Sequence, residues 1–168
     1  FSASFSMKKL LLGILFVSIS SASLFANSKP DGLLHVYFLD VGQGDAILIR
    51  TPSGKNILVD GGPGQSVLRE LKDTLPFFDR SLDLVISTHP DKDHIEGLIA
   101  VLQQQEVRQV FANGIMKSDY LSQSFFKAIH EKNIPVTYVS PSSDLDFGDG
   151  VALDVISPLV PQFSEEEK

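Results

Sequence analysis

The sequence has 168 residues, enough for a single domain with a hydrophobic core. Its formal net charge of −7 at pH 7 argues against a protein that wraps nucleic acid through a basic face, so we expect no stable nucleic-acid binding. Because the chain contains no cysteine, it can form no disulfide bond, and any bound metal ion must be held by histidine and carboxylate side chains.

The N-terminal segment is typical of a secretory signal peptide. After Met7 come two lysines, an apolar run too short to span a membrane, and a stretch rich in small residues. We expect cleavage after Ala26 or Ala22, with an uncleaved anchor as the alternative. Residues 1–26 are interpreted as upstream residues plus the signal peptide Met7–Ala26. The mature chain, residues 27–168, is expected to be periplasmic or secreted and to have no membrane span.

The mature chain predicts a run of strands followed by alternating helices and strands. Short apolar runs bounded by glycine and proline indicate the strands, and apolar residues at three- and four-residue spacing indicate the helices. The expected strands are residues 33–39, 46–50, 56–59, 82–87, 107–111, 136–139 and 151–156, and the expected helices are residues 65–75, 93–105 and 118–132. This order favours an α/β fold with a mixed sheet and helices outside it.

The chemistry is concentrated in the loop between the strand at 82–87 and the helix that begins near residue 93. His89, Asp91, Asp93 and His94 fall within six residues there. Neighbouring residues on a strand point to opposite faces, but on an irregular loop Asp93 and His94 can bind one ion while His89 and Asp91 bind a second. Imidazole and carboxylate are ordinary ligands for zinc and manganese. Two such ions, about 4 Å apart, can activate a bridging water.

A turn followed by a helix cap is the alternative interpretation of this loop. Asp93 is a good N-cap residue, Glu96 lies three residues later as a capping-box partner, and Asp91 suits a turn. The two histidines of the loop have no role in such a turn, which favours the metal site. The isolated His35 and His130 are interpreted as structural or surface residues.

Three motifs resemble the metallo-β-lactamase superfamily. The segment from His89 to His94 is similar to the family's His-x-His-x-Asp-His signature, with Asp91 at the second histidine position. Residues 38–46 resemble the opening motif of the metallo-β-lactamase-like domain of ComEC, the DNA-uptake channel, and of its soluble relatives. Residues 58–62 match the next motif, and Gly97-Leu98 follow the histidine cluster as in that family. The resemblance covers residues 33–157.

The resemblance implies a four-layer αββα sandwich with the site at one edge, between the two sheets. Asp60 would brace the metal loop through hydrogen bonds, as carboxylates behind metal ligands do, or would be a plain turn residue. Asp40 and Asp45 would face the same edge, or would only belong to a glycine-rich turn. The implied cofactor is a pair of divalent ions, zinc first, with manganese or magnesium as alternatives that the carboxylate of Asp91 favours.

The sequence departs from the family pattern after Ser157. Further ligands of the family, an aspartate in a Gly-Asp pair and a later histidine, are not found there, and Gly148-Asp149 comes too early for the pair. We therefore expect residues 27–168 to be a partial domain, the N-terminal portion of the sandwich, with one sheet face and one edge left unpaired.

The expected activity is that of a metal-dependent hydrolase that uses a metal-activated water on phosphodiester bonds, with Asp93 orienting the water or carrying its proton. The expected partner is a small-molecule or phosphodiester substrate; the oligomeric state is not predicted. Two alternatives remain: a non-catalytic metal- or ligand-binding remnant of the fold, and a lactone or thioester hydrolase, since a fold does not fix its substrate.

Overall fold

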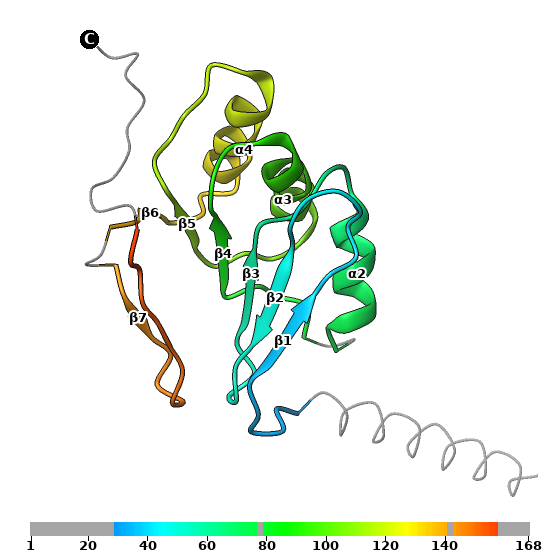
Figure 1. The fold of residues 1–168 in the computed structure, drawn as a ribbon, viewed down its shortest axis with the longest axis vertical. Helices are drawn as coiled ribbons and strands as arrows, with labels where there is room; N and C mark the ends of the chain where they lie inside the picture. The colour runs from blue at the N-terminus through cyan, green and yellow to red at the C-terminus, as the bar shows by residue number, and fades with distance from the viewer. Residues whose placement is uncertain (1–28, 77–78, 141–142, 158–168) are drawn as a thin grey trace, which may run out of the picture.

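The computed structural model describes residues 29–76, 79–140 and 143–157 (Figure 1). The predicted signal peptide Met7–Ala26 lies outside the described residues. Within the described part, none of the helices combines the length and the apolar character needed to cross a membrane.

A six-stranded mixed sheet forms the centre of the fold, and its strands follow one another in chain order. They are β1 His35–Phe38, β2 Ile47–Arg50, β3 Asn56–Val59, β4 Leu84–Ser87, β5 Val110–Ala112 and β6 Val136–Tyr138. The first three strands pair antiparallel, and β3 to β6 pair parallel. The carboxyl ends of β3, β4 and β5 therefore meet at one edge, and the residues that follow them are brought together there.

Three helices connect the parallel strands: α2 Ser66–Thr74, α3 Lys92–Gln104 and α4 Tyr120–Glu131. Their apolar sides join one face of the sheet in a core that includes Leu48, Leu58 and Val85 from the strands and Leu98 and Phe125 from the helices. All five side chains are almost fully buried. The predicted mixed α/β sheet with helices outside it is confirmed.

A short hairpin covers part of the opposite sheet face (Figure 1). Its strands are β7 Leu145–Asp146 and β8 Ala152–Leu153, and its buried Phe147 packs with Ile57 and Phe111 of the central sheet. β7 was not predicted, because two residues are too few to show a strand periodicity. Beyond the hairpin, Val36 and Phe38 of β1 are 48% and 81% exposed.

Candidate metal centre

The turn at residues 60–62, directly after β3, connects the sheet to the loop that carries His89 and His94. Asp60 has a positive φ of 54°, and its backbone N–H donates to the carbonyl of Ile86 at 2.9 Å. The N–H of Gly61 then donates to the carbonyl of His94 at 2.8 Å, and the N–H of Gly97 donates to the carbonyl of Gly62 at 2.9 Å. The first turns of α3 are thereby tied to the end of β3, so two motifs that lie 34 residues apart in sequence share one corner.

Two glycines allow this close approach. A Cβ atom at Gly97 would lie 1.9 Å from the carbonyl oxygen of Gly61, and one at Gly61 would lie 2.5 Å from the backbone nitrogen of Leu98. Both distances are far below any real contact, so neither position can hold a side chain unless α3 moves. The glycines that the sequence shows on either side of the metal loop therefore set its position against β3.

A series of hydrogen bonds through Asp60 and Thr88 orients His89 and His94 in the loop between β4 and α3, called the metal loop below. Asp60, only 3% exposed, accepts the Thr88 backbone N–H at Oδ1 (2.9 Å) and the Thr88 hydroxyl at Oδ2 (2.5 Å). The same Oδ2 atom lies 2.9 Å from Nδ1 of His94. The Thr88 hydroxyl oxygen lies 2.9 Å from Nδ1 of His89.

This chain assigns the same tautomer to both histidines. An ionised carboxylate can only accept, so the Thr88 hydroxyl and His94 Nδ1–H both donate to Asp60. The Thr88 hydroxyl has then used its single hydrogen and accepts from Nδ1–H of His89. The Nε2 atoms of His89 and His94 keep their lone pairs, and the two ring centroids are 3.8 Å apart. In the neutral form of both rings, these nitrogens could serve as ligands of a divalent cation.

Asp91 lies beside this pair of rings. It is the N-cap residue of α3 but makes no side-chain capping bond. Its Oδ2 is 3.6 Å from Nε2 of His89, near the roughly 3.4 Å that separates two ligands of a tetrahedral zinc ion. Its Oδ1 accepts a hydrogen bond from the ammonium of Lys117. That ammonium holds the pKa of Asp91 below its ordinary value, and Asp91 in turn raises the pKa of Lys117.

Asp93 stands in the first turn of α3, where it is partly buried. Within residues 29–76, 79–140 and 143–157, no hydrogen bond or ion pair engages its carboxylate. The alternative interpretation of Asp93 as an N-cap in a capping box with Glu96 is wrong. The cap position belongs to Asp91, and Glu96 instead accepts the backbone N–H of Gly64 at 2.9 Å.

The structure groups some of the sequence-predicted residues and separates others. Potential ligand atoms of Asp60, His89 and His94 all lie within 4.8 Å of one another. Asp40 and Asp45 are exposed and lie outside this group. Their turn nevertheless reaches the same edge, because the Asp45 carbonyl accepts the N–H of Gly62, and Gly44 packs against the backbone of Asp93.

Sequence reasoning missed three residues of the site, Thr88, Asn113 and Lys117. Thr88 links the two histidines to Asp60, and its position next to His89 was a usable signal. Asn113, just after β5, donates from Nδ2 to the carbonyl of Thr88 at 2.6 Å. Lys117 is 26 residues from Asp91, and nothing local in the sequence connects them.

A groove of about 300 Å³ opens beside the metal loop. Thr88 and Asn113 line it together with mainly apolar side chains: Val59, Ile86, Phe111, Val139, Leu153, Val155 and Ile156. The site therefore combines a polar cluster with an apolar recess between the sheet and the end of the β7–β8 hairpin.

Comparison with known proteins assigns the family. A search of curated proteins found no match to the chain. Residues 39–157 match the model of the metallo-beta-lactamase superfamily, and this range includes the corner at Asp60, the metal loop and the hairpin. The fold is accordingly that of the family's α/β sandwich, and the chain belongs to the metallo-beta-lactamase superfamily.

Proposed function

We propose that this chain is a metal-dependent hydrolase that acts on phosphodiesters. Its family and the cluster of Asp60, His89 and His94 support metal-dependent hydrolysis in general. One observation carries the proposal: the chain of hydrogen bonds through Thr88 and Asp60 leaves the Nε2 atoms of both histidines free to bind a cation. Asp60, at the base of this network, is buried, whereas Thr88 is exposed and the two histidines are partly exposed, so the rings are accessible to a cation.

The donor set fits two divalent ions. His89 and Asp91 would hold one ion, and Asp93 and His94 the other. Asp60 has three donors on its two oxygens, so it acts as the brace of both histidines rather than as a ligand. All donors are nitrogen or oxygen, which suits zinc first and manganese or magnesium next. When bound, the ions would supply Lewis acidity and lower the pKa of a coordinated water.

The protein side chains would orient the ligands, handle the attacking water and bind the substrate. Asp60 and Thr88 keep the two imidazoles in one orientation. Asp93, whose carboxylate has no protein partner in the described part of the chain, would orient the attacking water and accept its proton. The apolar groove beside Thr88 and Asn113 would take a non-reacting part of the substrate and exclude water from it.

Metal analysis combined with turnover tests the proposal. The metal-loaded chain should hydrolyse a chromogenic phosphodiester, and should do so faster than a chromogenic lactone or thioester. At saturating metal, Asp93→Asn should lose at least about 100-fold in kcat, in line with loss of general-base assistance, and it should bind the ion shared with His94 more weakly. His94→Ala should lose metal and activity together. A chain that binds metal at full occupancy without cleaving any phosphodiester would contradict the proposal.

A non-catalytic metal- or ligand-binding protein is the second candidate. It is favoured by the small size of the cluster. Among the described residues, only Asp60, His89 and His94 bring potential ligand atoms within 4.8 Å of one another, and Asp60 already accepts hydrogen bonds. This candidate predicts a single bound ion and no turnover of phosphodiester, lactone or thioester. Two bound ions with turnover would exclude it.

We also propose that the chain is exported and resembles the metallo-β-lactamase-like domain of ComEC. Residues 7–26 support export by their composition, and the motif from Phe38 to Ala46 supports the second assignment. Expression with the native N-terminus, followed by mass measurement of the chain from the periplasm or medium, tests export. A product that starts at Asn27 is expected; an unprocessed chain retained in the cell would contradict it.

A further inference from the structure

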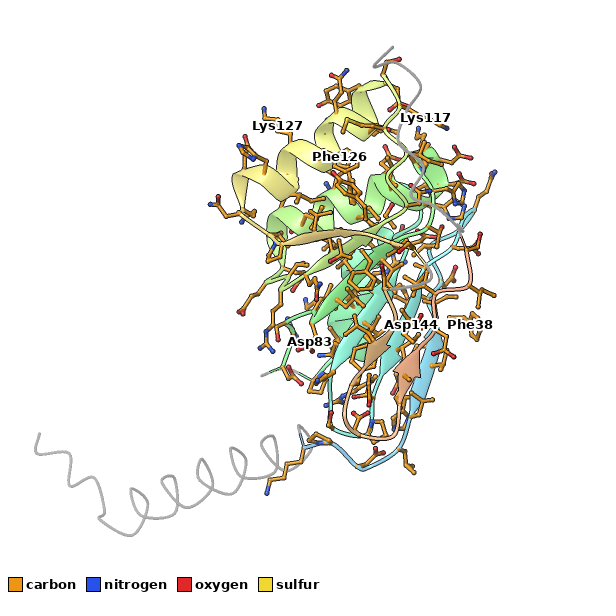
Figure 2. All side chains as sticks on the ribbon, turned by 90° about the vertical axis from the view of Figure 1, so that its left-hand side faces the viewer. Phe38, Asp83, Lys117, Phe126, Lys127 and Asp144 are labelled. Carbon is orange, nitrogen blue, oxygen red and sulfur yellow. The ribbon has the colours of Figure 1, made fainter. Side chains whose placement is uncertain are left out.

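A lysine from outside the metal loop reaches the candidate site. Lys117 lies on the loop between β5 and α4 (Figure 2). Its ammonium donates a hydrogen bond to the carboxylate of Asp91. The other oxygen of that carboxylate is 3.6 Å from Nε2 of His89. The carboxylate of Asp91 therefore lies between the Lys117 ammonium and the place where a divalent ion would bind.

The loop that carries Lys117 is held at both ends. At its start, Asn113 donates to the Thr88 carbonyl at 2.6 Å and accepts the N–H of Ile115 at 2.9 Å. At its end, Asp119 caps α4 by accepting the N–H of Ser122 at 2.8 Å. The fold thus keeps the base of Lys117 beside the metal loop, while its long side chain stays free to change partners.

The ion pair itself contributes little to stability. The side chains of Lys117 and Asp91 are 46% and 51% exposed, and solvent screens an exposed pair of this kind so strongly that it adds little to stability. Exchange of Asp91 for another anion therefore costs little. A stabilising role does not explain why the lysine lies at this point.

Bound divalent ions and the Lys117 ammonium are the cations that would offset the carboxylates around the site. Asp91 and Asp93 lie in the loop, Asp40 and Asp45 lie in the neighbouring turn, and the whole chain carries −7. An approaching phosphodiester is repelled by these carboxylates. If Asp91 shares its charge with a metal ion, the Lys117 ammonium loses part of its attraction to Asp91 and is available to an anionic oxygen.

We propose that Lys117 recognises the anionic group of the substrate, by donating a hydrogen bond from its ammonium to a non-bridging phosphate oxygen. This inference rests on the proposed phosphodiester hydrolysis and makes Lys117 the residue that selects anionic over neutral substrates. A charge-assisted hydrogen bond of this type corresponds to about a 10- to 100-fold change in affinity.

Binding of inorganic phosphate to the zinc-loaded full chain tests the inference without turnover. Isothermal titration calorimetry should show Lys117→Met binding phosphate about 10-fold or more weakly than the wild type, and Lys117→Arg within about threefold of it. Zinc affinity of Lys117→Met should be at least that of the wild type, because a competitor for Asp91 is gone. Lys127→Met is the matched control: Lys127 is 73% exposed on α4 and pairs with Glu131, away from the loop (Figure 2).

Turnover separates this inference from the proposed function. Lys117→Met should raise KM for a chromogenic phosphodiester and leave hydrolysis of a neutral ester unchanged. Equal losses on both substrates, or unchanged phosphate binding in Lys117→Met, would overturn the role of Lys117 while hydrolysis by the wild type stands. Weakened phosphate binding in Lys117→Met, in a chain that hydrolyses nothing, would support the role of Lys117 and count against the proposed function.

Discussion

Replacement of Asp60 by asparagine is the sharpest test of the metal centre. Asparagine is isosteric with aspartate and tolerates the positive φ of 54° at this position, so the backbone adds no strain of its own. Asp60 is 3% exposed and accepts three hydrogen bonds, one at Oδ1 and two at Oδ2. The substitution therefore changes the hydrogen bonds and the charge, and leaves the shape of the corner intact.

The geometry sets the magnitude of the effect. An asparagine that places its amide oxygen at the Oδ2 position keeps the Thr88 hydroxyl and His94, but turns its NH₂ group toward the Thr88 backbone N–H. One buried donor then has no acceptor, which costs about 1–3 kcal/mol. The two remaining bonds lose their charge assistance. We expect Asp60→Asn to lower the free energy of unfolding by about 2 kcal/mol and to weaken metal binding by about 10- to 100-fold.

Urea unfolding in a chelator measures the first effect, and competition with a chromogenic chelator measures the second. Asp73→Asn is the control, since Asp73 is exposed on α2 and its replacement removes the same charge outside the metal loop. Asp60→Ala should be worse than Asp60→Asn, because alanine in the left-handed region costs a further 1–2 kcal/mol, roughly. Wild-type zinc affinity in Asp60→Asn would refute the role given to the hydrogen-bonded chain.

Three further predictions follow from the same structure. Gly97→Ala should gain about 1 kcal/mol of helix propensity. The variant should nevertheless be destabilised overall by about 2 kcal/mol in urea unfolding, because its Cβ would lie 1.9 Å from the Gly61 carbonyl oxygen. A stabilised variant would refute the close approach of α3 to Gly61. Zinc at 100 times its dissociation constant should stabilise the chain by about 2.7 kcal/mol, measured as a thermal shift that His89→Ala abolishes; an equal shift in this variant would place the zinc elsewhere. Hydrogen bonds, first from the Ser53 hydroxyl and next from the Thr51 hydroxyl, lower the pKa of Asp149 from 3.8 to about 2. The contribution of Asp149 to stability is therefore complete above pH 3.8 and is lost as the pH falls toward 2. Asp149→Asn should therefore show a flatter acid limb in pH-dependent unfolding, and an unchanged limb would contradict the hydrogen bond to Ser53.

Local sequence determined the main elements and the loop. The strands at 56–59 and 84–87 are short apolar runs bounded by turn residues, and α3 shows a regular apolar face, so pattern alone located them. His89 and His94 are close in sequence, and their ring centroids lie 3.8 Å apart, so this proximity required no long-range information. The mixed sheet followed from the order of the elements.

Contacts between residues that are far apart in the sequence could not be predicted from local patterns. The bond from Lys117 to Asp91 spans 26 residues, and the bond from Ser53 to Asp149 spans 96. The cap position of α3 was also misjudged, because Asp91 and Asp93 are equally good cap residues and only the path of the backbone between β4 and α3 decides between them.

The sequence by itself determined the order of the strands and helices and the histidines and carboxylates of the loop between β4 and α3, because these depend on residues that are near neighbours in the chain. The tertiary structure decided which partners those side chains have. The parallel pairing of β3 with β4 places Asp60 behind Thr88 and His94, and the pairing of β4 with β5 brings Lys117 to Asp91. Both are consequences of sheet register, which links residues that are far apart in the chain.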